Sequence, residues 1–100
     1  GPDAKPTPVQ LAKAEAAARK LIDLGRPVEP EPWVGTRPCM PDMLPVVGPA
    51  ARHKGLWLHF GHGHQGFTLG PATGRILAEM MSGEAPSVDV KACAPARFGA

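Results

Sequence analysis

The sequence has little of what marks several large classes of protein. Tyrosine is absent, aromatic residues make up only 5% of the 100 residues, and no apolar run approaches the roughly 18 residues that a membrane span needs. Eleven Lys and Arg stand against nine Asp and Glu, and these charges are scattered. The sequence therefore predicts no transmembrane helix, no basic patch for nucleic acid and no polybasic membrane anchor.

Cysteine is also scarce. Cys39 and Cys93 are the only two, and they form no C-x-x-C pair. A disulfide framework in a small secreted fold usually needs four or more cysteines, and the chain starts with no charged and apolar leader. We therefore expect two reduced thiols in a cytoplasmic protein, and favour this over a single disulfide that closes a long loop.

Proline and glycine, in contrast, are abundant, with 13 and 12 residues. They are clustered without a fixed period, which excludes collagen. One hundred residues make at most one small domain with a thin core. The chain begins with Gly1-Pro2 rather than methionine, so we expect residues 1–100 to be a single piece of a longer protein.

The first quarter of the chain predicts one helix, over residues 7–25. Thr7 is expected as the N-cap with a proline directly after it, and Gly25 supplies the stop. The interior is rich in alanine, and apolar residues repeat at helical spacing to form one stripe. Glu15 lies four residues before Arg19, which is the favourable order for an ion pair.

The rest of the chain predicts short strands and a second helix. Seven prolines between residues 26 and 49 exclude a helix there, so we expect 33–49 to form turns and strands, with candidates at 33–34 and 44–47. Residues 55–83 predict a unit made of a buried strand over 55–60, a glycine-rich loop and a helix. That helix should start within 67–71 and end at Ser82, before Gly83. The tail, 84–100, is expected to be irregular apart from an extended piece at 88–90.

The loop over 61–66 reads G-H-G-H-Q-G and so matches the pattern G-x-G-x-x-G. A glycine-rich turn between a strand and a helix is the setting of a dinucleotide-binding fingerprint, because the free N–H groups at the helix start favour an electron-rich group. However, Asp89 falls 28 residues after Gly61, too far for the acidic residue of that fingerprint. An anion- or ring-binding turn and a turn that only allows close packing both stay open.

Three histidines crowd the same stretch, at His59, His62 and His64. The spacings H-x-x-H and H-x-H could place two imidazoles on one zinc or copper ion, which would make the chain a small metal-binding module. No thiolate or carboxylate lies nearby in the sequence to complete a set of four ligands. We therefore favour stacked or hydrogen-bonded histidines over a metal site.

Arg37 lies between a glycine-containing segment and a proline-stiffened turn. Most arginines are solvated surface residues, and this one can be one of them. A planar guanidinium held between rigid segments also suits bidentate binding of a carboxylate. The sequence alone leaves both interpretations open.

Three motifs occur in order between residues 33 and 83. They are R-P at 37–38, P-D-M-L-P-V-V-G at 41–48 and G-H-G-H-Q-G-F-T-L-G-P-A-T-G at 61–74. Together they resemble the C-terminal end of the FAD-dependent D-amino acid oxidase and dehydrogenase family, which includes glycine oxidase and sarcosine oxidase. The likeness is strongest to bacterial D-amino acid dehydrogenases.

The resemblance implies an FAD-dependent enzyme that oxidises an amino acid, with D-amino acids favoured, by hydride transfer to the flavin. The product would be an imino acid that hydrolyses to a 2-oxo acid. Arg37 corresponds to the arginine that binds the substrate carboxylate, and the backbone at His64 would reach the substrate amine. The loop that would lie along the flavin ring consists of His62, Gly63, His64, Gln65, Gly66, Phe67 and Thr68.

The implied fold is an α+β fragment of two helices with short strands, the C-terminal part of a two-domain α/β FAD-binding fold. Its partners would be a small amino acid and the N-terminal FAD-binding part of the same protein, without which the fragment should neither bind FAD nor be active. An apolar edge at 56–58 predicts self-association of the isolated fragment. Whether the enzyme docks on the inner membrane stays open.

Two departures bear on the branch of the family that the chain resembles. Sarcosine oxidases carry a lysine where this chain has Thr68, and they attach flavin through a cysteine whose place here is near Gly35. Cys39 is out of register with that position. The resemblance therefore favours a non-covalent dehydrogenase or a glycine-oxidase-like enzyme over a sarcosine oxidase.

Overall fold

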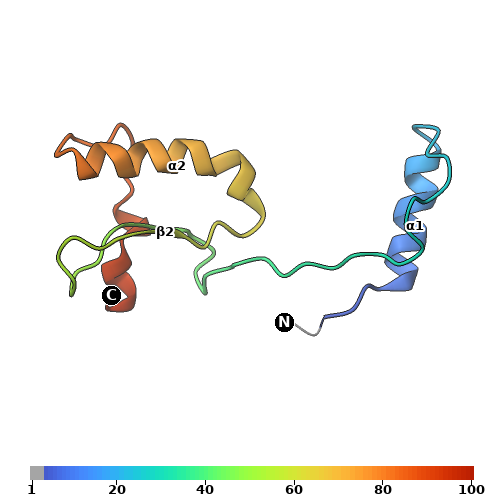
Figure 1. Cartoon of the computed structure of the whole chain (residues 1–100), viewed down its shortest axis with the longest axis horizontal. Helices are drawn as coiled ribbons and strands as arrows, with labels where there is room; N and C mark the ends of the chain where they lie inside the picture. The colour runs from blue at the N-terminus through green and yellow to red at the C-terminus, as the bar shows by residue number, and fades with distance from the viewer. Residues whose placement is uncertain (1–3) are drawn as a thin grey trace. The chain divides into compact units, whose positions relative to one another are not determined.

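The computed structural model describes residues 4–100, so the Gly1-Pro2 start lies outside the described residues. The chain divides into two units, Gly1–Thr36 and Arg37–Ala100. The elements of both are drawn in Figure 1. Within the described residues, no helix is both long and apolar enough to cross a membrane.

The first unit contains one helix, α1, Pro8–Arg19. Its N-cap is Thr7, as predicted, but the Thr7 side chain makes no capping hydrogen bond. Glu15 Oε1 and Arg19 Nη2 are 2.9 Å apart, which confirms the predicted ion pair.

The predicted length of α1 is wrong, because the helix ends at Arg19 and not near Gly25. The backbone N–H groups of Leu21 and Ile22 both donate to the Ala18 carbonyl, which closes the helix in a tight turn. Leu21 is 85% exposed, and no residue of α1 is buried. The described part of its own unit therefore gives the apolar stripe no surface to pack on, and tertiary packing is what usually extends a helix beyond its local signals.

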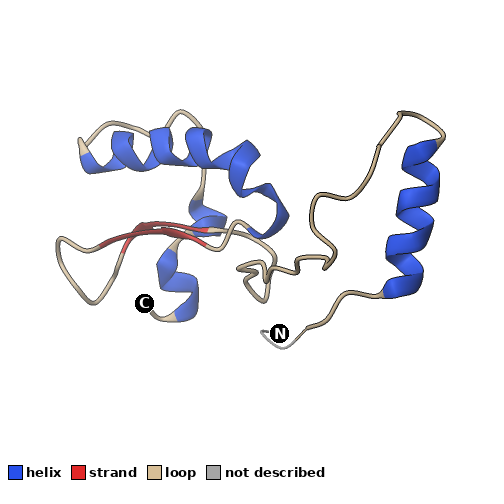
Figure 2. Ribbon diagram, turned by 45° about the vertical axis from the view of Figure 1, so that its right-hand side comes forward, coloured by secondary structure: helices blue, strands red, loops and turns tan. Residues whose placement is uncertain are grey.

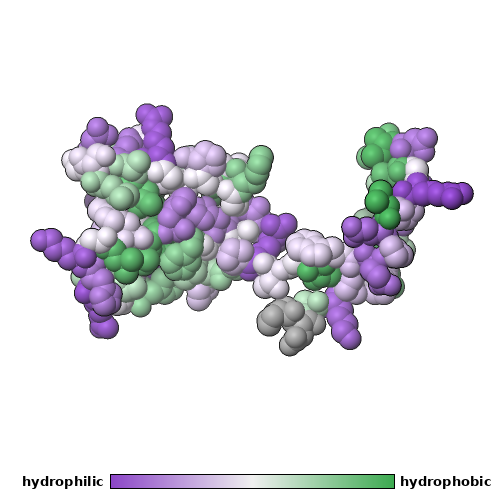
Figure 3. Space-filling view, viewed as in Figure 1, coloured by the Kyte–Doolittle hydropathy of each residue, from purple (hydrophilic) through white to green (hydrophobic). Residues whose placement is uncertain are grey.

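No strand forms at 33–34, so that prediction is also wrong. Trp33 is 86% exposed and lies in an irregular segment that prolines interrupt. A strand needs a neighbour that completes its hydrogen bonds, and the described part of this unit supplies none. Figure 3 shows apolar side chains on the surface of this part of the chain.

The second unit is built on a hairpin of two antiparallel strands, β1, Val46–Pro49, and β2, Trp57–Phe60. The register pairs Val46 with Phe60 and Val47 with His59. Because side chains alternate along a strand, Val47 and His59 share one face of the hairpin, while Val46 and Phe60 share the other. Val46 and Val47 are each only 2% exposed and form the centre of a small core.

Helix α2, Gly66–Met81, covers one face of the hairpin (Figure 2). It begins one residue before the predicted window and ends at the C-cap Ser82, followed by Gly83 with φ of +75°. Ile76, on the predicted apolar face, is 5% exposed, but Met81 is 56% exposed and does not join the core. The strand–loop–helix order of 55–83 is therefore as predicted.

The tail packs on the hairpin rather than running irregularly. It forms two 3₁₀ helices, η2, Lys91–Cys93, and η3, Pro95–Phe98, and the predicted extended piece at 88–90 forms no strand. Pro95 is fully buried, and its Cδ would lie 3.3 Å from a Cβ added at Gly48 of β1. Glycine at that position lets the tail approach the strand closely.

The prediction that β2 is buried is wrong. Trp57 and Leu58 are half-buried, while His59 and Phe60 are exposed. The sheet has only two strands, so β2 is an edge strand with one neighbour. An edge strand in so small a unit leaves much of its surface open. The described residues thus form a small α+β unit and a separate helix.

Candidate functional site

The loop after β2 lies beside the segment that carries Arg37. Gly63 N donates a hydrogen bond of 3.0 Å to the carbonyl of Pro38, and Cys39 and His62 form an isolated antiparallel bridge. This contact joins two segments that are more than 20 residues apart in the sequence. It requires the backbone of Gly63 to turn through a φ of +59°, a conformation that glycine adopts without strain.

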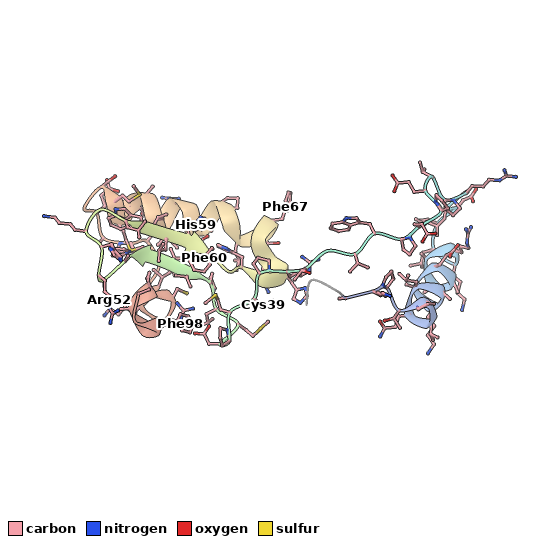
Figure 4. All side chains as sticks on the ribbon, turned by 60° about the horizontal axis from the view of Figure 1, so that its bottom comes forward. Cys39, Arg52, His59, Phe60, Phe67 and Phe98 are labelled. Carbon is pink, nitrogen blue, oxygen red and sulfur yellow. The ribbon has the colours of Figure 1, made fainter. Side chains whose placement is uncertain are left out.

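Arg37 comes directly before the bridged residues. Its side chain is exposed, and it makes no hydrogen bond or ion pair with the part of the chain that the structure describes. Arg37 is therefore the residue next to Pro38, to which the loop is hydrogen-bonded, and its guanidinium stays available to a ligand. Arg52 lies at the opposite end of the hairpin, in the turn between the strands (Figure 4).

A cavity of about 270 Å³ lies between the two segments. Its lining combines sulfur-bearing and apolar side chains with polar groups of the loop. The residues that line it are Cys39, Met40, Met43, Leu44, Pro45, Gly61, His62, Gly63, His64, Gln65 and Leu69. Four of the seven predicted flavin-loop residues therefore lie at this cavity.

The other three predicted loop residues, Gly66, Phe67 and Thr68, do not line the cavity. They form the exposed first turn of α2, and Phe67 is 99% exposed and points away from the helix (Figure 4). The N-cap residue Gln65 makes no side-chain hydrogen bond to this turn. A 3₁₀ turn, η1, Gly63–Gln65, leads directly into α2, and no side-chain cap competes with an external acceptor for the first N–H groups of the helix.

His59 and His62 meet at one hydroxyl. The Nε2 atoms of these rings lie 2.7 Å and 2.9 Å from Oγ1 of Thr73, and the rings meet edge to face with centroids 4.8 Å apart. His64 is exposed and does not join them. Among residues 4–100, no three His, Cys, Asp or Glu side chains are placed to hold a metal ion, so the metal-binding alternative finds no ligand set there.

Burial, and then the charge of neighbouring His59, hold the pKa of His62 below its ordinary value of 6.5. Burial disfavours the charged ring because it removes water, and a second imidazolium nearby would repel it. His62 is therefore a neutral ring at neutral pH. A neutral imidazole has one donor nitrogen and one acceptor nitrogen, so His62 can either donate a hydrogen bond to a ligand or accept one, depending on which nitrogen carries the hydrogen.

Arg97 is hydrogen-bonded to the segment 42–45, which forms part of the cavity lining. No role was predicted for this residue from the sequence. Its Nε donates to Asp42 Oδ2 at 2.7 Å, and its Nη2 donates to the carbonyls of Leu44 at 2.8 Å and Pro45 at 3.1 Å. The hydrogen bond from Arg97 holds the pKa of Asp42 below its ordinary value. These bonds fix the turn that contains Met43, whose φ of +62° is rare outside glycine.

Apart from the nearby Ala94 carbonyl, the partners of Arg97 lie more than 50 residues away in the sequence, so no local pattern could reveal its contact with the turn at 42–45. Thr73 was missed for the same reason, because the two histidines that it contacts come from a strand and a loop that precede its helix. The two cysteines are free, as predicted.

The sequence of the chain matches the protein family described as FAD dependent oxidoreductase (DAO) over residues 1–80. Among curated proteins, a glycine oxidase from Pseudomonas aeruginosa is 38% identical over 97 residues, which cover 96% of this chain and 27% of that protein. A D-amino acid dehydrogenase from Paramagnetospirillum magneticum is 36% identical over 99 residues, 98% of this chain and 23% of that protein.

A second dehydrogenase, D-amino acid dehydrogenase 2 from Mesorhizobium japonicum, is 46% identical over 59 residues, which are 59% of this chain and 14% of that protein. The chain therefore spans about a quarter or less of the length of these relatives. No solved structure gave a significant match. Since the family match covers residues 1–80, most of the chain, the chain belongs to the family of FAD-dependent oxidoreductases.

Proposed function

We propose that this chain is the substrate-side part of an enzyme that oxidises an amino acid with FAD. In this proposal, Arg37 binds the substrate carboxylate and the loop over 62–68 lines the flavin ring. The observation that carries the proposal is the hydrogen bond from Gly63 to Pro38, because it ties the arginine-bearing segment to the loop. A ligand at the cavity could then meet both segments at once.

The loop has the chemistry that a flavin ring edge requires. Its backbone turns at Gly61 and Gly63, with φ of +81° and +59°, and the uncapped start of α2 follows directly. Free N–H groups and the positive end of a helix favour an electron-rich edge that gains negative charge. FAD, when bound, supplies the two-electron redox step.

The residues of this chain would bind the substrate and orient it toward the flavin, and none of them would react with it chemically. Arg37 can donate two parallel hydrogen bonds to a carboxylate, which fixes both the position and the orientation of the substrate. The backbone at His64 would approach the substrate amine. The cavity wall formed by Met40, Met43 and Leu69 is apolar and would keep water from the reacting carbon.

The rest of the enzyme would supply most contacts to the adenine and pyrophosphate of FAD. The chain alone should therefore bind FAD poorly and show no activity. The two substrate classes in the names of its relatives, glycine and D-amino acids, both need a carboxylate site. The ratio of kcat/KM for glycine and for D-alanine in the whole flavoprotein would decide between them.

Substitution of Arg37 tests the proposal in the full flavoprotein that carries this chain. We expect Arg37→Ala to raise KM for amino acids about tenfold to hundredfold, because hydrogen bonds to charged groups contribute about 1.5–3 kcal/mol. Bound flavin, measured by its absorbance per protein, should fall little. Arg37→Lys should restore only part of the affinity, since lysine cannot donate two parallel bonds.

The matched control is Arg52→Ala, which removes the same side chain from the far end of the hairpin. It should leave KM unchanged. An Arg37→Ala enzyme whose KM equals that of the Arg52→Ala enzyme would remove the role assigned to Arg37. Loss of flavin from Arg37→Ala, with an unchanged KM in the loaded fraction, would contradict it as well.

A further inference from the structure

Thr73 joins His59 to His62, which lines the cavity, and has no role in the function proposed above. Its side chain is buried in α2, with the residue 8% exposed, and its Oγ1 receives the Nε2 atoms of His59 and His62 at 2.7 Å and 2.9 Å. The same oxygen lies 2.8 Å from the carbonyl oxygen of Leu69. The carbonyl oxygen of Gly70 lies farther away, at 3.3 Å, so four polar atoms surround one hydroxyl at hydrogen-bond distance.

The hydrogen atoms of this cluster can be assigned by counting. A hydroxyl has one hydrogen and two lone pairs, and a carbonyl oxygen can only accept. The Thr73 hydrogen therefore goes to the carbonyls of its own helix, to Leu69 at 2.8 Å with Gly70 more distant at 3.3 Å, because donation to a ring would leave two oxygen lone pairs facing each other at 2.8 Å. Both lone pairs of the hydroxyl then accept, one from His59 and one from His62, so each ring carries its hydrogen on Nε2.

This assignment leaves Nδ1 of His62 as a hydrogen-bond acceptor. His62 lines the cavity, and within the described residues its Nδ1 has no hydrogen-bond partner. If the ring carried its hydrogen on Nδ1 instead, this nitrogen would be a donor. The tautomer therefore decides which ligand groups His62 can bind, and a ligand that presents an N–H group suits the acceptor.

We propose that Thr73 is a positioning residue that fixes His62 in its Nε2–H tautomer, so that Nδ1 accepts a hydrogen bond from the amino group of the bound amino acid. The proposal rests on the proposed function for the identity of that ligand. Arg37 would then hold the carboxylate and His62 the amine of the same molecule. His59 completes the arrangement by occupying the second lone pair of Thr73, which prevents that hydroxyl from turning its hydrogen toward a ring.

The first experiment reads the tautomer without any flavin. Long-range proton–nitrogen NMR of the chain labelled with ¹⁵N-histidine distinguishes Nε2–H from Nδ1–H rings, and the exposed His53 and His64 are internal references. We expect His59 and His62 to be Nε2–H rings in the unmodified chain and in Thr73→Ser, which keeps the hydroxyl. In Thr73→Val, which keeps the shape but not the hydroxyl, His62 should become a mixture like the references.

An Nδ1–H ring at His62 in the unmodified chain overturns the proposal without any variant, so it stays falsifiable even if Thr73→Val does not fold. An unchanged Nε2–H signal in a folded Thr73→Val chain overturns it too. The second experiment measures KM for the amino acid in the full flavoprotein. Because a mixture keeps part of the Nε2–H population, KM should rise about twofold in Thr73→Val, in proportion to the Nε2–H population that is lost, and hardly at all in Thr73→Ser.

An unchanged KM in Thr73→Val contradicts the link between the tautomer and the substrate, even where the NMR result is as expected. Failure of the proposed function looks different. In that case Arg37→Ala would leave KM unchanged, while His62 would still be an Nε2–H ring that depends on the Thr73 hydroxyl.

Discussion

Helices α1 and α2 differ in the way that matters for a binding site. Helix α1 has strong local signals, namely alanine-rich composition, proline at its first position and an internal ion pair, yet none of its residues is buried. Helix α2 contains a proline and several glycines, yet it buries Thr73 and Ile76 against the hairpin. Local propensity forms a helix, but only contacts distant in sequence hold a side chain in place, and the site lies in the second unit.

The core of the second unit gives the largest expected contrast. Ile76→Ala should lower the free energy of unfolding of that unit by about 2–4 kcal/mol, because it removes buried methyl groups and leaves a cavity. Leu21→Ala removes a similar volume from a residue that is 85% exposed and should change stability by less than about 0.5 kcal/mol. Urea unfolding monitored by NMR amide signals, which separates the units, measures both, and equal effects would break the comparison.

Two arginines give the next contrast. Arg97→Ala should destabilise the second unit by about 1–3 kcal/mol, because it removes hydrogen bonds to the carbonyl groups of Leu44, Pro45 and Ala94, which then lack that donor. Arg19→Ala breaks the exposed pair with Glu15 and an exposed hydrogen bond of 3.2 Å from Nη2 to the Gly25 carbonyl, and should cost less than about 1 kcal/mol. The helicity measured by circular dichroism tests the value for Arg19→Ala, and the urea midpoint of the second unit tests the value for Arg97→Ala. A stability of the Arg97→Ala chain equal to that of the unmodified chain would show that the turn does not need this brace.

Acid should weaken the second unit through the same contact. The pKa of Asp42 lies below its ordinary value of 3.8, chiefly because Arg97 donates a hydrogen bond to it. The folded chain therefore binds fewer protons than the unfolded chain below that pH, so the stabilisation is complete above 3.8 and is lost as the pH falls through the folded pKa. Urea midpoints measured against pH should fall less steeply in this acidic range for Arg97→Ala than for the unmodified chain.

His62 adds a smaller change at higher pH. Its pKa is also lowered, so its contribution is complete above about 6.5 and is lost as the pH falls through the folded value. In His62→Gln, whose side chain does not titrate, the stability should be flatter over that interval. A His62→Gln profile that runs parallel to that of the unmodified chain would contradict the lowered pKa.

What the sequence predicted well was local. The strand, glycine loop and helix of 55–83 follow from a short apolar run, closely spaced glycines and an apolar helical face, and the structure has them in that order. The Glu15–Arg19 pair is likewise a matter of spacing within one helix. These features depend on residues that are only a few positions apart, so a local sequence pattern is enough to predict them.

What the sequence did not predict depends on pairing across the chain. The segments at 33–34 and 88–90 have strand-like side chains but no partner strand, so neither forms one. The strand β2 has apolar residues but only one neighbouring strand, so it is not buried. Besides carbonyls within their own turns, Thr73 and Arg97 bind groups 11 to 55 residues away, and nothing in the neighbouring sequence signals those distant contacts.

The central claim is that Arg37, beside the glycine loop, is the carboxylate site of a flavoenzyme. Titration of the oxidised full-length flavoprotein with a simple carboxylate such as benzoate, followed by the flavin absorbance, tests it most directly. We expect the spectral change to saturate in the unmodified and Arg52→Ala proteins, and to need about ten times more ligand or more in Arg37→Ala. The same dissociation constant in Arg37→Ala as in Arg52→Ala would contradict the claim.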